Sequence, residues 1–348
     1  HMFNAQTVGQ LAQEYATEIP SFDAAKFERE ALIGFAEREL MQRLEWMADC
    51  VEDQLSSDFP TMADQLETAM PTSLDPVLTD DDFGHFIHAV PGILAVRHGL
   101  EDHRERALDL LYVATQRFSM EFYIRPFLNR WPDETLTRLV EWGVDENYHV
   151  RRLVSEGTRP RLPWAKSITL TQDQTVPLLN RLHCDQTRYV TRSVANHLND
   201  IAKIDADRVV GLLREWSTAG KQSAKELNWM TRHCLRTLVK QGHVGALDLL
   251  GFRADAPVRV SAKILTPVVV MGDAVSFEIE ITSETDCPVL VDYRIDFARA
   301  DGNRAEKVFK LKQGKVGLSA PLSLQKSHKL KAGASTFTLY EGAHHITI

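Results

Sequence analysis

Apolar and polar residues follow two different periods in two parts of the chain. Up to about residue 250, apolar residues recur at the spacing of amphipathic helices, and helix-breaking residues separate the runs. From Ala256 onward apolar and polar residues alternate one by one, which is the period of half-buried strands. We therefore predict a helical domain over residues 1–254 and a β domain over residues 255–348.

The helical part reads as a series of helix pairs. Pro132 begins a helix that Gly143 ends, and residues 145–158 supply its antiparallel partner. Nearer the N-terminus, an amphipathic run covers residues 27–53 and includes Ile33 in its apolar stripe. The remaining predicted helices cover residues 175–184, 186–198, 206–217 and 224–240.

One short pattern occurs three times at intervals of 40 residues. The copies read HVRRLVSEG, YVTRSVANH and WMTRHCLRT, and each has an arginine at the same place: Arg152, Arg192 and Arg232. A period near 40 residues is typical of α-helical solenoids of the HEAT type, in which each helix pair buries its apolar face against its neighbours. The sequence therefore predicts a HEAT-like solenoid followed by a β domain.

The three arginines are predicted to form a row on one face. Packed helices lie about 8–10 Å apart, so the row would extend over roughly 20 Å, a length that could follow a phosphate backbone. Arginines at a fixed place in a helical repeat also commonly bond to carboxylates or helix ends of the next repeat. The spacing alone leaves both interpretations open.

Charge is unevenly distributed along the chain. Residues 1–150 contain 11 Lys and Arg against 28 Asp and Glu, whereas residues 151–250 contain 16 against 9. A basic segment in a chain whose formal net charge is -8 favours an acidic partner, and a basic stripe on a repeat scaffold is typical of nucleic-acid binding.

Composition narrows the class of protein. At 348 residues and 44% apolar residues, the chain is long enough for two domains with cores. It contains no membrane-spanning run and no secretory signal pattern. Its four cysteines form no CxxC pair, which indicates a reducing compartment, and we predict a cytoplasmic protein.

The sequence lacks the motifs of several classes of cofactor-binding protein. No Walker A loop, GxGxxG or GxSxG motif is present, so we predict no nucleotide cofactor. A histidine-rich stretch contains one HxxH but no HExxH, which makes a metal site a weak alternative; its histidines are His85, His88, His98 and His103.

The C-terminal part contains six segments with strand periodicity. They read VRVSAKI, AVSFEIEIT, VLVDYRIDF, KVFKLK, STFTLY and HHITI, and residues 301–303 predict a hairpin loop. Such short strands predict an antiparallel immunoglobulin-like β-sandwich. The later strands of this domain are rich in lysine. Two interpretations are open: the charges block edge-to-edge aggregation, or they form a second DNA contact. The lysines are Lys307, Lys310, Lys312, Lys315, Lys326, Lys329 and Lys331.

Two segments of the helical part have an unusual composition. In residues 115–131, Glu121 is surrounded by aromatic and aliphatic residues, and residues 149–164 place Glu156 at a predicted helix end, before Arg159 and Trp164. Asp200 ends the second repeat helix and could face the same groove. A carboxylate at a helix C-terminus is mildly unfavourable, so local structure does not explain Glu156.

Carboxylates, arginines and an indole in one groove suit cleavage of a glycosidic bond. Anionic side chains would stabilise an oxocarbenium-like sugar and position the attacking water. In this interpretation the arginines hold flanking phosphates, and Trp164 packs on a sugar or on the damaged base. The alternative from the residues alone is structural, with Glu121 and Glu156 as ion-pair partners of Arg125 and Arg152.

The same two segments resemble the AlkC family of bacterial alkylpurine DNA glycosylases. The matching strings are TQRFSMEFYIRPFL and HVRRLVSEGTRPRLPWA, and the resemblance extends over residues 83–252. The β part resembles the immunoglobulin-like domain that some members of this family carry at the C-terminus.

The resemblance implies a monofunctional DNA glycosylase built from HEAT-like repeats, with no metal or redox cofactor. Family members remove cationic alkylated bases, 3-methyladenine and 3-methylcytosine, from duplex DNA without drawing the base into a deep pocket. The expected partner is alkylated double-stranded DNA, and we predict a monomer. Motif positions carried over are Glu121 and Glu156 for sugar stabilisation and water positioning, Trp164 for sugar or base contact, and Arg152 and Arg159 for phosphates, with Asp200 as a third catalytic carboxylate.

A second hypothesis belongs to a different class of protein. A non-catalytic HEAT-repeat scaffold would bind DNA or another protein through the same groove. It predicts that replacing Glu121 or Glu156 by glutamine leaves function intact.

Overall fold

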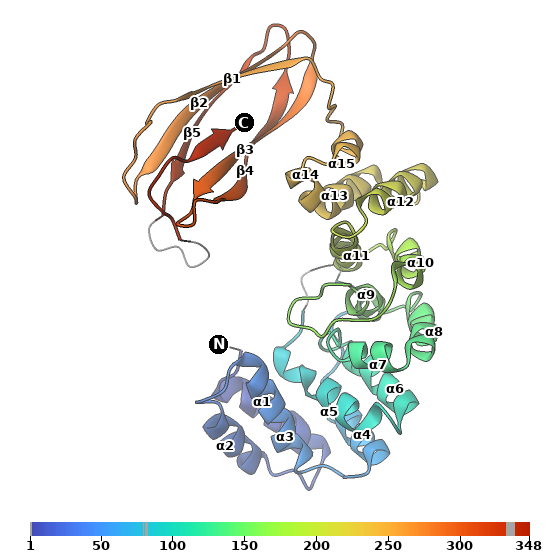
Figure 1. The fold of residues 1–348 in the computed structure, drawn as a ribbon. Coiled ribbons are helices and arrows are strands. Elements are labelled where there is room, and N and C mark those ends of the chain that lie inside the picture. Colours follow the sequence, from blue (N-terminus) through green and yellow to red (C-terminus); the bar gives the residue numbers. More distant parts are fainter. Residues whose placement is uncertain (1, 79, 81–82, 332–337) are drawn as a thin grey trace. The chain divides into compact units, whose positions relative to one another are not determined.

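The computed structural model describes residues 2–78, 80, 83–331 and 338–348. These residues form two compact units, one up to Arg236 and one from Thr237 onward. Figure 1 shows stacked helices in the first unit and antiparallel sheets in the second. Helices precede strands in the chain, so the predicted fold class is confirmed.

The first unit is built from short helices in sequential contact. In chain order they are α1 (Ala5–Glu18), α2 (Ala24–Gly34), α3 (Leu40–Glu52), α4 (Phe59–Thr68), η1 (Phe86–Ala89), α5 (Val90–Gly99), α6 (Arg104–Ala114), α7 (Ile124–Arg130), α8 (Pro132–Trp142), α9 (Tyr148–Gly157), α10 (Gln172–Leu182), α11 (Arg188–Ile201), α12 (Ala206–Ala219), α13 (Ala224–Cys234) and α14 (Arg236–Lys240), which continues into the second unit.

The predicted helix pairs appear with bounds close to the expected ones. Helix α8 begins at Pro132, whose missing N–H costs nothing in a first turn. It ends at Gly143, whose amide donates to the Leu139 carbonyl at 2.9 Å. Helix α9 is capped by the Asn147 side chain, which accepts from the amide of His149 at 2.9 Å. Local capping chemistry therefore sets these boundaries.

Helices α9, α11 and α13 carry the three copies of the 40-residue pattern. Helix α11 packs against both α9 and α13, so the copies lie on successive helices of one row. Leu153 of α9 and Val190, Val194 and Leu198 of α11 are fully buried. Each such side chain contributes about 1.5–3 kcal/mol on burial, and this shared apolar stripe aligns the polar faces of α9 and α11.

The amphipathic run over residues 27–53 is not one continuous stripe. It forms α2 and α3, and Ile33 is 74% exposed, so its predicted place in the apolar stripe is wrong. The helices approach closely at Gly34, where an added Cβ would lie 2.0 Å from Nε1 of Trp46. The close approach of an aromatic side chain to a glycine therefore determines how the two helices pack.

The second unit contains the β domain. Its strands are β1 (Val258–Ile264), β2 (Ala274–Ser283), β3 (Cys287–Ala298), β4 (Arg304–Val316), β5 (Leu322–Lys329) and β6 (His345–Thr347). They form two antiparallel three-stranded sheets, ordered β1-β2-β5 and β4-β3-β6. Helix α15 (Val244–Leu249) precedes them, so the change from helix to strand falls between Leu249 and Val258.

Alternation places one face of each central strand in a shared core. Phe277 and Ile279 of β2 and Tyr293 and Ile295 of β3 are buried in one cluster. The predicted hairpin over residues 301–303 is confirmed between β3 and β4, where the Arg299 amide donates to the Asn303 carbonyl at 3.0 Å. The segment STFTLY at 335–340 lies partly outside the described residues.

Candidate functional site

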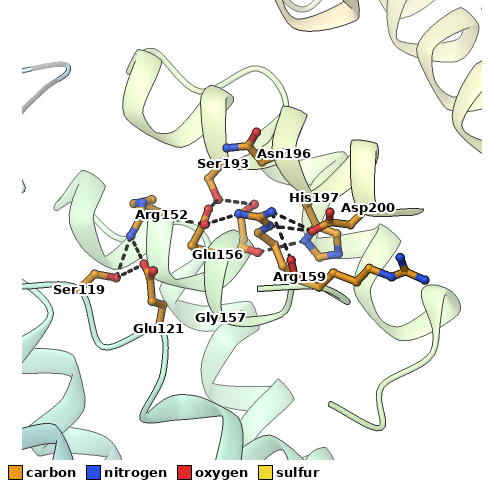
Figure 2. Close-up of polar contacts among 12 residues, drawn as sticks. Ser119, Glu121, Arg152, Glu156, Gly157, Arg159, Ser193, Asn196, His197 and Asp200 are labelled. Atoms are coloured by element: carbon orange, nitrogen blue, oxygen red, sulfur yellow. Dashed lines mark hydrogen bonds and ion pairs between the residues drawn. The ribbon is translucent and has the colours of Figure 1, made fainter. Parts of the chain in front are cut away.

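The three predicted carboxylates come from three segments of the helical unit that meet beside α9 and α11. Glu156 lies near the end of α9, Asp200 near the end of α11, and Glu121 in the loop between α6 and α7. Figure 2 shows their side chains linked through arginines. The structure therefore brings together groups that are up to 79 positions apart in the sequence.

Glu156 is 5% exposed, and both of its carboxylate oxygens have partners. Its Oε1 accepts from Nη1 of Arg159 at 2.6 Å and lies 3.8 Å from Nη2 of Arg152. Its Oε2 accepts from the hydroxyl of Ser193 at 2.6 Å. The carboxylate is therefore held in one orientation by α9, α11 and the loop after α9 (Figure 2).

Arg159 bridges two of the carboxylates. Besides Glu156, its Nε donates to Oδ2 of Asp200 at 2.9 Å, and Asp200 also accepts from Nζ of Lys203 at 3.1 Å. Arg159 is 8% exposed and Asp200 is 2% exposed. Removing one charge from such a buried pair would leave the other uncompensated, so the three groups form one unit.

Glu121 is bound on the other side of Glu156. Arg152 donates to Oε2 of Glu121 and, at 2.7 Å, to the hydroxyl of Ser119. The Arg152 guanidinium also lies over the ring of Tyr189, 4.6 Å from its centroid. Arg152 thus connects Glu121 to Glu156, and the alternative prediction of a Glu121 or Glu156 ion pair with Arg152 is confirmed.

Opposing effects act on the charge of Glu156. Burial would raise its pKa, but the positive charges of Arg152 and Arg159 and the hydrogen bonds from Ser193 and Arg159 outweigh burial, so its pKa lies below the ordinary value. Arg152 stays charged because Glu121 and Glu156 overcome the cost of its burial and raise its pKa. The site therefore keeps a buried, ionised carboxylate at neutral pH.

Arg125 supports the loop that carries Arg159. It is fully buried and donates to the carbonyls of Gly157 at 2.9 Å, Arg159 at 2.8 Å and Lys166 at 2.6 Å. Burial, and next the charge of Arg159, lower its pKa to about 10, which leaves it charged at neutral pH. The alternative prediction that Arg125 pairs with a carboxylate is wrong: among the described residues Arg125 forms no ion pair, and its Nε and Nη1 donate to backbone carbonyls instead.

Trp164 lies on the same loop with its side chain in solvent. It is 84% exposed and has a φ of 62°. Pro163 precedes it, and the amide of Ala165 donates to the carbonyl of Leu162 at 3.3 Å, as in a type II turn. That turn favours glycine where Trp164 stands, so the strained backbone here presents a large aromatic surface outward.

The other two predicted DNA-binding arginines lie on the next two helices of the row. Arg192 on α11 pairs with Asp80 at 2.5 Å and is about one third exposed, whereas Arg232 on α13 is exposed. Arg152 and Arg159 differ from them, because both guanidinium groups are mostly buried against carboxylates. The row of three arginines therefore passes from a buried ion pair to an exposed side chain.

The histidine-rich stretch has structural partners. His88 lies 2.9 Å from Oε2 of Glu14, and His98 lies 2.8 Å from Oε1 of Glu52. Among the described residues, no group of three or more His, Cys, Asp and Glu side chains is placed to hold a metal ion. No helix within the described ranges is long and apolar enough to cross a membrane.

Sequence reasoning missed the hydroxyl and imidazole groups around the carboxylates. Ser119 contacts Arg152, Ser193 contacts Glu156, and His197 contacts the carbonyl of Ser155. One signal could have found Ser193: it is a polar residue at the position of the repeated pattern where the first copy has the buried Leu153. His197 also lies in the second copy of the pattern, whereas Ser119 lies outside all three copies.

Comparisons with known proteins agree with this architecture. Residues 259–348 match the family model described as "Uncharacterised protein YhaZ, C-terminal Ig-like domain". The chain is 30% identical over 356 aligned positions to "Uncharacterized protein YhaZ" of Bacillus subtilis (strain 168), covering 100% of this chain and 94% of that relative.

A solved structure is similar over nearly the whole chain. It is Pseudomonas fluorescens alkylpurine DNA glycosylase AlkC bound to DNA containing an abasic site analog, with a TM-score of 0.85 and 31% identity over 99% of this chain and 93% of that one. Fold and comparisons together define a helical-repeat protein with a C-terminal immunoglobulin-like domain. The chain belongs to the AlkC family of alkylpurine DNA glycosylases, in the subset that carries this domain.

Proposed function

We propose that the protein is a monofunctional DNA glycosylase that hydrolyses the N-glycosidic bond of cationic alkylated bases, 3-methyladenine and 3-methylcytosine, in duplex DNA. One observation carries the proposal: Arg159 holds the buried carboxylates Glu156 and Asp200, next to the Glu121–Arg152 pair. A chain of the same fold and family is a DNA glycosylase bound to DNA.

The chemistry of the lesion fits such a site. When the bond between C1′ and the base nitrogen breaks, the electron pair leaves with the cationic base, which departs neutral and needs no proton from the protein. The sugar becomes an oxocarbenium-like cation, which ionised carboxylates stabilise. Water then adds to C1′ and loses its proton to a carboxylate. Burial and arginine pairing keep Glu156 ionised for this role.

We assign the proposed catalytic roles to the three carboxylates. Glu156 and Glu121 stabilise the sugar cation and position the water, and Asp200 assists as a third carboxylate. Each is attached to an arginine, so the anionic charge is fixed in place before DNA arrives. Such preorganisation is what makes electrostatic stabilisation effective in an enzyme site.

The burial of the arginines suggests different roles for them from the prediction that all four bind DNA. In this proposal Arg152 and Arg159 align the carboxylates, since most of each guanidinium is covered. Arg192 and the exposed Arg232 bind phosphates of the DNA backbone. Trp164 stacks on the sugar or the damaged base, because its indole is presented to solvent on the loop that also carries Arg159.

The test is identification of the released base. Duplex DNA methylated at known positions is incubated with the wild type, and the products are separated by chromatography. The proposal predicts free 3-methyladenine and 3-methylcytosine and an intact strand carrying abasic sites. Salt-dependent DNA binding without base release would instead support the non-catalytic scaffold. A monomeric, cytoplasmic protein remains our prediction.

A further inference from the structure

Ser193 makes a contact that the proposed roles of the carboxylates do not include. It lies on α11, is 2% exposed, and its Oγ is 2.6 Å from Oε2 of Glu156 and 2.9 Å from Oγ of Ser155. The ionised Glu156 can only accept, so the single Ser193 proton points to Glu156. Ser155 must then donate to Ser193. The two hydroxyls form a directed chain that ends on the carboxylate.

A histidine completes this arrangement on the side away from Glu156. Nδ1 of His197 lies 3.0 Å from the carbonyl of Ser155, and a carbonyl can only accept, so the ring proton is on Nδ1. His197 is fully buried, and burial lowers its pKa to about 4. The neutral ring therefore ties α11 to the α9 backbone without adding a charge beside the carboxylate.

We propose that Ser193 is a positioning residue of the reaction: its hydroxyl fixes Oε2 of Glu156, while Arg159 fixes Oε1. The inference rests on the proposed function, because it assigns Ser193 to the glycosylase role of Glu156. Two donors on opposite oxygens define the rotation of the carboxylate plane, which a single arginine contact would leave free.

The next repeat contains the same contact with different chemistry. His233 on α13 follows Ser193 by 40 residues, and Asn196 on α11 follows Glu156 by 40 residues. Nε2 of His233 lies 2.8 Å from Oδ1 of Asn196, which also accepts from Arg236 at 3.1 Å. At both places a side chain on one repeat helix contacts a polar side chain on the preceding one. The acceptor is a carboxylate for Ser193 and an amide oxygen for His233. His233 and Asn196 provide a matched control.

The groups that set the charge of Glu156 come from every element packed around it. Without the Ser193 hydroxyl, burial would be opposed only by the charges of Arg152 and Arg159 and by the Arg159 hydrogen bond, so the pKa of Glu156 would rise. The charged or titratable groups around the carboxylate are Arg152 on the same helix, Arg159 on the following loop, Tyr189, Asp200 and His197 on α11, Glu121 through Arg152, and Arg125, which supports the loop.

The experiment compares Ser193→Ala, Ser193→Thr and His233→Ala with the wild type. The ¹³C shift of the Glu156 side-chain carboxyl, assigned by its absence in Glu156→Gln, reports its pKa without any reaction. Single-turnover base release from methylated duplex DNA, followed against pH, reports the consequence for the reaction. Thermal unfolding of each variant identifies loss of folding.

We expect Ser193→Ala to raise the pKa of Glu156 by about one unit and to slow base release about 10-fold at neutral pH, the scale of one hydrogen bond to a charged group. The acid limb of the rate profile should move to higher pH by the same amount. Ser193→Thr, which keeps a hydroxyl, should have a Glu156 pKa and a rate of base release close to those of the wild type. His233→Ala should alter neither quantity.

The inference is overturned if a folded Ser193→Ala leaves the Glu156 titration and the acid limb unchanged, or if His233→Ala produces equal shifts. In either case the wild-type rate would still support the proposed function. A wild type that binds DNA but releases no base would overturn the proposed function, and this inference with it. If Ser193→Ala does not fold, the folded Ser193→Thr must still titrate like the wild type.

Discussion

Two arginines of the helical unit each bridge two carboxylates, in contrasting surroundings. Arg106 on α6 holds Glu67 at 2.6 Å and Asp64 at 2.7 Å on α4, whereas Arg159 holds Glu156 at 2.6 Å and Asp200 at 2.9 Å. The side chains of the first group are 23%, 29% and 75% exposed, and those of the second are 10%, 6% and 3% exposed. The geometry is similar, but the burial is not.

This difference shows that the energetic effect of an ion pair depends on how far water reaches its charges. Water screens the Arg106 group, so its charges contribute little to stability. The Arg159 group is desolvated, so its members depend on one another and are expensive to separate. A buried ion pair is therefore weak evidence for stability, and we propose that this one holds an ionised carboxylate in place for the reaction.

The largest expected effect comes from removing each bridging arginine. Arg159→Met should lower the free energy of unfolding by about 3–5 kcal/mol, because Glu156 and Asp200 stay buried without the arginine that joins them. Arg106→Met should cost under about 1 kcal/mol. Urea unfolding at neutral pH measures both. Equal losses would show that burial does not separate the two groups.

A smaller effect should appear in the pH dependence of stability. Burial lowers the pKa of His197 to about 4, below the ordinary value of 6.5, so the unfolded chain binds the proton more readily. The contribution of His197 is complete above pH 6.5 and is lost as pH falls toward 4. Between pH 6.5 and 5 it amounts to about 2 kcal/mol.

Urea unfolding of the wild type and of His197→Gln at pH 6.5 and 5 isolates the contribution of His197 to the pH dependence of stability. The variant should show a shallower pH dependence of stability than the wild type. A wild type and a His197→Gln protein with parallel pH dependence would mean that His197 is not held neutral by burial.

The smallest expected effect concerns the exposed end of the arginine row. Arg232→Ala should weaken DNA binding and reduce the slope of log affinity against log salt by about one unit, as for a single phosphate contact. Arg208, which pairs with Asp173 on a different helix, offers the control Arg208→Ala. Fluorescence anisotropy over a range of salt measures both. An unchanged slope for Arg232→Ala would remove it from the DNA interface.

Local signals in the sequence were sufficient for much of the helical fold. Pro132, Gly143 and the 40-residue period are short-range features, and they predicted α8, α9 and the row of repeat helices. Alternation predicted five of the six described strands at least in part, but not β5, whose alternating Leu322 and Leu324 stand among residues noted only for their lysines.

Long-range contacts were harder to predict. The motif residues Glu121, Glu156 and Arg159 indicated the carboxylate site. They did not indicate that Arg159 bridges Glu156 to Asp200, which lies 41 residues after Arg159. Packing across repeats decides which polar side chains meet, and periodicity only shows that they share a face. The close approach of Trp46 on α3 to Gly34 on α2 is likewise a tertiary contact that periodicity does not predict.

The most direct test of the central claim measures base release and DNA affinity for Glu156→Gln and Glu67→Gln in parallel. Glu156→Gln should slow single-turnover release about 10²–10³-fold while DNA binding stays the same or strengthens, because an anion has left a DNA-binding face. Glu67→Gln, which neutralises the matching carboxylate of the exposed group, should release base like the wild type. A Glu156→Gln protein that folds, binds DNA and releases base at the wild-type rate would contradict the account.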